Sequence, residues 1–252
     1  MLISAAIITY NEERNIARCL ESLRGVVDEI VVVDSFSKDR TEEICLKYGA
    51  RFIPNAFEGH IQQKNFAIDQ TSHDWVLSLD ADEALDEDLK KSILAMKENP
   101  QFKGYSMNRL TNYCGHWVRH CGWYPDTKVR LVHKSCARWT GVNPHDRLDM
   151  LHGESFGHLK GDILHYSYYT REDHLKQIEY FGDIAAKELF QRSARISHVM
   201  LWMKVVAQFF KSYFLKLGFL DGSTGWTISR LSAFATLRKY TKLMDLYRNK
   251  KN

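Results

Sequence analysis

Continuous apolar runs alternate with amphipathic segments over the first hundred residues. Strand-like runs cover 3–10, 27–37, 51–55 and 74–83, and segments with helical spacing cover 11–25, 39–50 and 59–71. Runs without polar alternation are typical of strands buried on both faces, and their alternation with helices favours a parallel sheet. The pattern therefore predicts an α/β fold with a mainly parallel sheet and flanking helices.

Each long strand of this half ends in polar residues. The first ends in Thr9, Tyr10, Asn11 and Glu12, the second in Asp34 and Ser35, and the fourth in Asp80 and Asp82. Ligands of open parallel sheets bind in the crevice beyond the carboxyl ends of the strands. We therefore expect these side chains to line a cleft instead of being buried in the core.

The D-x-D at the end of the fourth strand is a candidate metal site. Alternate residues of a strand point to the same side, so Asp80 and Asp82 can share one ligand. Carboxylate oxygens in a half-open cleft suit Mg²⁺ or Mn²⁺, which take further ligands from phosphate oxygens. The alternative is a solvated acidic turn that caps the next helix.

The alternation of apolar strands and helices ends at about Pro100. Residues 104–134 resemble meandering, aromatic-rich strands, and 171–192 has the pattern of a helix. We predict one α/β domain over 1–190, with a regular half over 1–100 and a more irregular half over 101–190. A basic helical tail follows over 191–252, interrupted by a loop signal at 218–226.

Charge is distributed unevenly along the chain. The net charge is +4, but residues 192–252 hold 12 Lys and Arg against 2 Asp and Glu, which leaves +10 there and −6 elsewhere. The apolar segment 198–219 contains Lys204, Lys211 and Lys216, too many charges for a spanning helix. Lys204, Gln208 and Lys211 form one narrow polar face, as in a helix that lies in a membrane interface with its basic face towards the head groups.

That tail therefore predicts an anionic membrane surface as partner and no nucleic acid. The alternative is packing on the catalytic domain or on a second copy, which would make the protein a homo-oligomer. The first residues lack the basic leader of a signal peptide, so we expect a cytoplasmic protein at the inner face of the plasma membrane. The cysteines show no paired framework, and we expect reduced thiols at positions 19, 45, 114, 121 and 136.

Two nucleotide-binding motifs are absent. A dehydrogenase needs G-x-G-x-x-G after its first strand, where this chain has TYNEER, and no P-loop occurs. Nucleotide binding must therefore depend on side chains and a metal. The run CGHWVRHC (114–121) invites a zinc site, but its spacing matches no standard pair, which favours ordinary loop residues.

Four segments of the first hundred residues carry a specific combination of motifs: AAIITYNEERNIARCLESL, EIVVVDSFSKDRTEEI, QKNFAI and WVLSLDADE. Together they resemble the family 2 glycosyltransferases of the GT-A fold. YPDTKVRLVHK, GVNPHDRL and LHYSYYTREDHLKQIEYF are similar to the bacterial lipopolysaccharide core beta-1,4-glucosyltransferase subgroup. The resemblance implies a nucleotide-diphosphate sugar donor, a divalent metal and inversion at the anomeric carbon. It also implies that 1–190 is the catalytic domain, with a nucleotide-sugar-binding half (1–100) and an acceptor-binding half (101–190).

The resemblance also implies roles on the donor side. Residues 9–12 would line the nucleoside pocket, and Asp34 would accept a hydrogen bond from the uracil N–H. Lys64 would lie near the diphosphate. Asp82 would bind the metal, with Asp80 at the ribose or in the metal shell.

On the acceptor side, Asp146 matches the position of an acidic general base. The subgroup commonly has Glu after His there, and the alternative for Asp146 is a turn carboxylate paired with Arg147. His165 would be either a third metal ligand or a structural histidine. Arg109 and Arg130 would hold a diphosphate or an acidic acceptor, or form surface pairs.

The sequence thus predicts an inverting, metal-dependent transfer of a sugar onto a lipid-linked saccharide such as a lipopolysaccharide core, with UDP-glucose as the expected donor. One alternative is a non-catalytic protein that binds sugar nucleotides. Another is a sugar-phosphate nucleotidyltransferase, which should open with a glycine-rich basic loop that this chain lacks.

Overall fold

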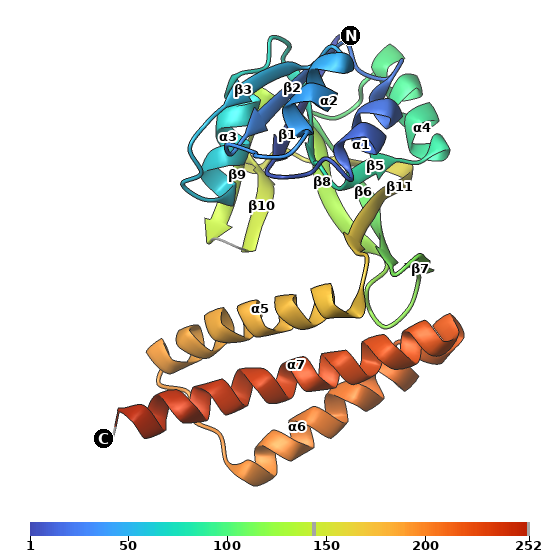
Figure 1. Ribbon diagram of the computed structural model, residues 1–252. Coiled ribbons are helices and arrows are strands. Elements are labelled where there is room, and N and C mark those ends of the chain that lie inside the picture. The colour runs from blue at the N-terminus through green and yellow to red at the C-terminus, as the bar shows by residue number, and fades with distance from the viewer. Residues whose placement is uncertain (143–144, 251–252) are drawn as a thin grey trace. The chain divides into compact units, whose positions relative to one another are not determined.

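The computed structural model describes residues 1–142 and 145–250 (Figure 1). The chain forms two compact units. The first comprises Met1–Leu110 and Asp126–Tyr166, and the second comprises Thr111–Pro125 and Ser167–Asn252. The prediction of a domain boundary after residue 190 stays a prediction, and the two units are described separately below.

The strands and helices follow each other in an α/β order. The strands are β1 (Ile3–Thr9), β2 (Glu29–Asp34), β3 (Arg51–Pro54), β4 (Trp75–Asp80), β5 (Glu83–Leu85), β6 (Gly104–Tyr113), β7 (His116–Val118), β8 (Asp126–His133), β9 (Ala137–Val142), β10 (His145–Met150) and β11 (Gly157–Tyr168). The helices are α1 (Ile16–Leu23), α2 (Thr41–Lys47), α3 (His60–Asp69), α4 (Glu87–Glu98), α5 (Arg171–Gln191), α6 (His198–Phe210) and α7 (Gly222–Asn249).

The main sheet has the strand order β3-β2-β1-β4-β8-β6-β11-β5, with β7 paired to β6. Strands β3, β2, β1 and β4 are parallel neighbours. Strand β8 is antiparallel to β4 and to β6, and β5 is antiparallel to β11. The predicted α/β class is confirmed, and the parallel part coincides with the strands predicted from the continuous apolar runs.

Two apolar layers cover the parallel strands. Ile3, Ala5 and Ile7 of β1 pack with α1, α2 and α4, whereas Ala6 of β1 packs with α3 and the hairpin β9–β10. Alternate residues of β1 thus point into different apolar layers. Both faces of the strand are buried, which explains its unbroken apolar sequence. Burying a large aliphatic side chain contributes about 1.5–3 kcal/mol, so these layers hold the strand ends rigidly.

The helix predicted over 11–25 begins only at Ile16. Asn11 has a φ of 53°, its backbone N–H donates to Ser37 Oγ at 2.7 Å, and its Oδ1 accepts from the backbone N–H of Lys38 at 2.8 Å. The N–H of Glu12 donates to Thr41 Oγ1 at 2.9 Å. These bonds to the loop after β2 keep residues 11–15 out of the helix.

Helix α4 was not predicted. Its signals are local: the side chain of Asp86 accepts from the N–H of Leu89, and Leu89, Ile93 and Met96 are buried at helical spacing. The helix covers the sheet beside α1 and completes the first apolar layer.

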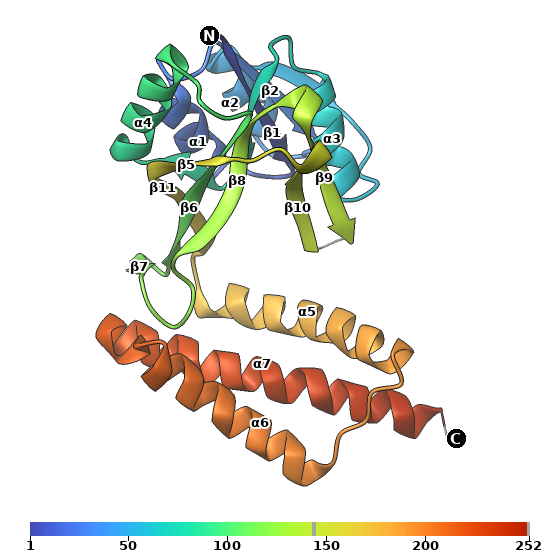
Figure 2. The same ribbon diagram turned by 180° about the vertical axis from the view of Figure 1, so that it is seen from behind.

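In the second unit, α7 packs against both α5 and α6 (Figures 1 and 2). The loop predicted over 218–226 is partly wrong, because α7 already begins at Gly222. A Cβ at Gly225 would lie 1.7 Å from the carbonyl oxygen of Gly218. The glycines there allow two backbones to approach closely, and they do not signal a long loop.

Helix α6 packs beside α7, and both lysines of its polar stripe, Lys204 and Lys211, are exposed. Gln208 is half-buried, and the Lys204 ammonium lies 5.8 Å from the ring centre of Tyr240 on α7. The prediction that this stripe faces the head groups stays a prediction, and large apolar side chains of α6 are exposed as well. No helix in the described ranges is both long enough and apolar enough to cross a membrane.

Candidate active site

The parallel register aligns the polar strand ends at one edge of the sheet. Thr9 of β1 is the partner of Asp34 of β2, and Ile8 of β1 is the partner of Asp80 of β4. The residues that follow these strands therefore begin at a common level, as expected for the ligand edge of a parallel sheet.

Asp34 and Thr9 are buried polar residues at this edge of the sheet. Both oxygens of the Asp34 carboxylate accept hydrogen bonds from Ser37, one from its N–H at 2.7 Å and one from its hydroxyl. The Thr9 hydroxyl is buried and has no hydrogen-bond partner within the part of the chain that the structure describes. A buried polar atom without a partner is rare in native proteins and is commonly satisfied by water or by a ligand.

Glu12 follows β1 and is half-buried. Asn15 Nδ2 donates to its Oε2 at 2.7 Å. Burial is the main reason that the pKa of Glu12 rises from 4.5 to about 7, and the negative charges of Asp82, Asp39 and Asp80 raise it further. Glu12 thus belongs to an acidic region at this edge, and a cation binding there would favour its charged form.

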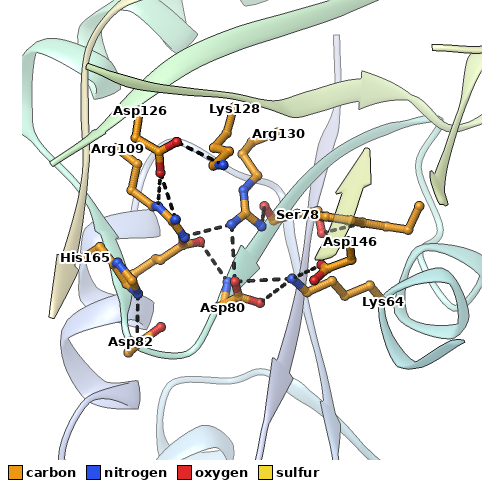
Figure 3. A network of polar contacts seen from close by, with 12 residues as sticks. Lys64, Ser78, Asp80, Asp82, Arg109, Asp126, Lys128, Arg130, Asp146 and His165 are labelled. Carbon is orange, nitrogen blue, oxygen red and sulfur yellow. Dashed lines mark hydrogen bonds and ion pairs between the residues drawn. The ribbon is translucent and has the colours of Figure 1, made fainter. Parts of the chain in front are cut away.

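Lys64 joins the two sides of the site (Figure 3). Its ammonium on α3 lies 3.1 Å from Asp80 Oδ1 and 2.8 Å from Asp146 Oδ2, and it lies 4.3 Å from the ring centre of Trp139. The lysine is 5% exposed, so the structure buries a cation between two carboxylates. Because such a charge needs partners, Lys64 fixes the positions of Asp80 and Asp146.

Two further cations, Arg130 and Arg109, contact the carboxylates of the site. Arg130 Nη2 lies 3.2 Å from Asp80 Oδ2 and 2.8 Å from Glu83 Oε1. Arg109 Nη1 lies 3.3 Å from the same oxygen of Glu83, and Arg109 Nη2 lies 2.8 Å from Asp126 Oδ2. The Glu83 carboxylate is therefore a buried anchor for two guanidinium groups, and it also accepts from the N–H of Asp80 at 3.0 Å.

The charges in this network keep Asp80 ionised. Burial by itself would raise the pKa of Asp80, but the Lys64 ammonium and the Arg130 guanidinium hold it well below its usual range. Burial likewise disfavours the charged form of Arg130, and Glu83 and Asp80 outweigh it and raise the pKa of that guanidinium. The carboxylate of Asp80 is a permanent anion at neutral pH.

Asp82 pairs with His165 at the other side of the turn. His165 Nε2 lies 3.1 Å from Asp82 Oδ2. Asp82 is in the turn directly before β5, and His165 of β11 is the strand partner of the next residue, Glu83. Burial opposes ionisation of Asp82, but His165 outweighs it and lowers the pKa of the carboxyl. An imidazole and a carboxylate that already converge are a donor set that fits Mn²⁺ or Mg²⁺.

Among the residues that the structure describes, no group of three or more His, Cys, Asp or Glu side chains is arranged to hold a metal ion. Two protein ligands with further ligands from a diphosphate are, however, a common arrangement for these cations. The predicted metal roles of Asp80, Asp82 and His165 stay predictions.

The sequence model of glycosyl transferase family 2 matches residues 4–149, which is more than half of the chain. The chain belongs to glycosyl transferase family 2. The matched range contains every predicted site residue except His165.

Relatives of this glycosyltransferase match nearly its whole length. An uncharacterized glycosyltransferase of Rickettsia typhi is 30% identical over 260 residues, covering 99% of this chain and 89% of the relative. The lipopolysaccharide core biosynthesis glycosyltransferase LpsC of Rhizobium meliloti is 26% identical over 252 residues, covering 92% of this chain and 90% of the relative. A crystal structure of S. aureus TarS 1–349 in complex with UDP-GlcNAc has a TM-score of 0.47 and 14% identity, covering 99% and 92% of the two chains.

Six of the predicted site residues of the glycosyltransferase come together in two groups. Lys64, Asp80, Arg130 and Asp146 form one network, and Asp82 and His165 form a pair beside it. Tyr10 and Asn11 are exposed on the loop after β1, next to Glu12. Their roles with the donor stay predictions.

Three further residues of the network were not assigned a role from the sequence. Glu83 and Asp126 balance the arginines, and the ring of Trp139 lies under Lys64 while its Nε1 donates to Ser78 Oγ at 3.3 Å. Glu83 could have been found, since a third acid directly after D-x-D in a strand needs a cation. Trp139 gave no signal, because only the register of the hairpin, Trp139 to Leu148, brings it to the site.

The Cys- and His-rich run 114–121 belongs to the second unit. His120 Nδ1 lies 2.9 Å from Asp221 Oδ1, and Cys121 is buried against Gly225 and Ser229. Cys114 is exposed, and all five cysteines are free. These contacts agree with the interpretation as structural loop residues.

Proposed function

We propose that this glycosyltransferase transfers glucose from UDP-glucose, with inversion, to a lipid-linked saccharide of the lipopolysaccharide core type at the inner face of the membrane. The observation that carries the proposal is the network in which Lys64 joins Asp80, at the donor strand end, to Asp146. The membership in family 2 supports the reaction class. The name of LpsC, similar over 92% of this chain, supports the acceptor class.

In the proposed mechanism the donor lies at the strand ends. Asp34 would accept from the uracil N–H, residues 9–12 would enclose the nucleoside, and Asp80 would bind the ribose or complete the metal shell. Asp82 and His165 would hold a divalent cation, which would stabilise the negative charge on the departing diphosphate. The buried cation Lys64 would add to this stabilisation.

Asp146 would act as the general base. It would take the proton of the acceptor hydroxyl as the hydroxyl oxygen bonds to the anomeric carbon from the face opposite the diphosphate. The bond from that carbon to the diphosphate oxygen breaks, and UDP leaves with the bonding electrons. Lys64, at 2.8 Å, would orient the carboxylate of Asp146 towards the acceptor.

The proposal is tested by separating donor binding from transfer. Asp146→Asn keeps size and removes the base, so transfer should fall by about 10²–10⁴-fold while binding of UDP-glucose with Mn²⁺ is retained. Asp82→Asn should lose transfer and also make UDP binding insensitive to Mn²⁺. Asp88→Asn, an exposed aspartate of α4, is the matched control and should transfer at the parent rate.

Two results would contradict the proposal. If both site variants keep transfer within a few-fold of the parent, the assignment of the two aspartates is wrong. If the parent binds UDP-sugars but neither transfers nor slowly hydrolyses any of them, the protein is a non-catalytic sugar-nucleotide-binding protein.

A further inference from the structure

The outward side of α6 and the turns after it form an unusual surface. About half of the exposed large apolar side chains in the described ranges lie between Val199 and Trp226, a segment of about a ninth of the chain. We call this surface the α6 face. Its members are Val199, Met200, Trp202, Met203, Val206, Phe210, Phe214, Leu215, Leu217, Phe219, Leu220 and Trp226.

Within α6, the exposed apolar side chains recur at helical spacing along one side, and further members follow in the turns and at the start of α7. Leu201 is buried and Gln208 is half-buried on the side of α7, whereas Trp202, Met203 and Val206 are exposed on the opposite side. Trp202 is 58% exposed and Met203 is 66% exposed. Contiguous apolar surface on this scale marks a site of interaction, because soluble surfaces rarely carry it.

The charges around the α6 face select the partner. Residues 192–226 contain Arg192, Arg195, Lys204, Lys211 and Lys216 and one acid, Asp221, which is buried and paired with His120. Lysine stems can lie along apolar surface while their ammonium groups reach outward, which places positive charge at the rim of the apolar stripe. A surface with an apolar centre, aromatic rings and a purely basic rim is complementary to an anionic bilayer interface.

A second copy of the chain is the less suitable occupant. A two-fold dimer through the α6 face would bring the basic rims of both copies together. The one acid within 192–226, Asp221, is buried and paired with His120, so the basic rims would face each other, and like charges placed opposite each other oppose association.

We infer that the α6 face inserts into the surface of anionic bilayers and that it holds the enzyme on the membrane without a spanning helix. The inference deepens the proposed function, on which it rests for the statement that the acceptor lies in that membrane. Insertion of the apolar stripe would supply the affinity, and the basic rim would supply the preference for anionic lipid.

The apolar part is tested by flotation with vesicles of phosphatidylcholine, with and without phosphatidylglycerol, and without donor or acceptor. The parent should bind the phosphatidylglycerol vesicles at low salt. The double variant Trp202→Gln, Met203→Gln should weaken the apparent partition coefficient by about tenfold or more. The matched control Leu46→Gln, Leu94→Gln changes two exposed leucines on helices of the first unit and should bind like the parent.

The basic part is tested in the same assay. Lys204→Glu, Lys211→Glu should abolish the preference for phosphatidylglycerol, whereas Lys47→Glu, Lys91→Glu in the first unit should retain it. High salt should reduce binding of the parent, since exposed charges are screened. Circular dichroism would check that each variant is folded.

Insertion itself is measured by quenching of tryptophan fluorescence with brominated lipids. Trp202→Phe keeps an apolar ring, so binding should persist while the quenched fraction of the fluorescence falls. Quenching equal to that of the parent would place Trp202 outside the bilayer and overturn the inference.

Three other outcomes would overturn the inference. The first is a parent that binds neither vesicle at low salt. The second is that each double variant of the α6 face changes vesicle binding no more than its matched control in the first unit. The third is a dimer in sedimentation velocity that the Trp202 and Met203 changes dissolve, without binding of the parent to vesicles.

The proposed function can fail separately from the inference. Slow hydrolysis of UDP-glucose in solution needs no membrane, and the α6 variants should retain it at the parent rate. A protein that binds vesicles but does not use UDP-glucose would refute the proposed donor and leave the membrane surface in place.

Discussion

The site network and the α6 face depart from the usual distribution of residues in opposite directions. The first unit buries charges: Lys64, Glu83 and Arg130 are each at most 5% exposed. The second unit exposes large apolar side chains, and Trp202 and Met203 are both more than half exposed. Lys, Glu and Arg are almost never fully buried without partners, and large apolar patches are rarely left in water.

The two departures have different energetic consequences for folding. Each buried charge in the network loses its hydration and must be compensated by its neighbours, so the network is held together tightly. The most exposed side chains of the α6 face, such as Trp202 and Met203, are already largely in water in the folded protein and gain little from folding. Residues in the network should therefore be sensitive to substitution, and residues of the α6 face should tolerate it.

The largest effect is expected from Glu83→Gln. The change keeps the size of the side chain but leaves Arg109 and Arg130 without the carboxylate that both contact. Removing one partner from a buried charge network costs about 3–5 kcal/mol in the free energy of unfolding. Urea denaturation followed by circular dichroism would measure the loss.

The matched control for that variant is Glu43→Gln. Glu43 forms an exposed pair with Arg40 at 3.1 Å, and exposed pairs contribute little. The control should leave the denaturation midpoint unchanged. Equal midpoints for Glu83→Gln and Glu43→Gln would mean that the buried network does not stabilise the first unit.

A smaller effect, visible as a pH dependence, is expected from Glu12. Burial, followed by the nearby carboxylates, raises its pKa from 4.5 to about 7, so the folded state binds this proton more tightly than the unfolded state. The stabilisation from that proton is complete below pH 4.5 and is lost as the pH rises to about 7. Thermal unfolding of the parent should show this decline.

Glu12→Gln should remove the decline, because the amide does not titrate. The variant Glu98→Gln, at an exposed position of α4, should retain the pH dependence of the parent. If the parent and Glu12→Gln show the same slope between these pH values, another group causes it. The same measurement with Mn²⁺ would show whether a cation favours the charged form.

Much of the first unit could be predicted from the sequence. The continuous apolar runs located β1, β2 and β4, and the rule that parallel strands present their carboxyl ends together placed Asp34, Asp80 and Asp82 at one edge. The late start of α1 could not be predicted from periodicity. It depends on hydrogen bonds between Asn11 and residues 37–38, which are distant in sequence.

The pairings in the site needed the tertiary structure. Lys64 and Asp146 are 82 positions apart, and nothing in either motif indicates their contact. Glu83 is a partial exception, since a buried acid requires a cation somewhere, although not necessarily Arg109 and Arg130. The resemblance to family 2 supplied roles for individual residues, whereas the structure shows which of those residues touch.

The orientation of α6 also needed the structure. The spacing of Lys204, Gln208 and Lys211 indicated a narrow polar stripe, but the direction of that stripe depends on α7, whose start was placed too late. Gly218 and Gly225 were interpreted as loop signals, whereas they permit close packing of two backbones. A glycine that serves packing cannot be distinguished by sequence alone from one that serves a turn.

The smallest effect on the free energy of unfolding is expected for an exposed residue of the α6 face. Two neighbouring residues of α6, one buried and one exposed, allow a direct comparison. Leu201 of α6 is 4% exposed, and Leu201→Ala should cost about 2–5 kcal/mol through lost burial and a cavity. Trp202→Ala, one position further along, should change the free energy of unfolding by no more than about 0.5 kcal/mol, since its side chain is in water in the folded protein. Urea denaturation in the absence of lipid would measure both variants. A large loss for Trp202→Ala in dilute, monomeric protein would mean that the face packs against the protein itself, and the reason to assign it to a membrane would disappear.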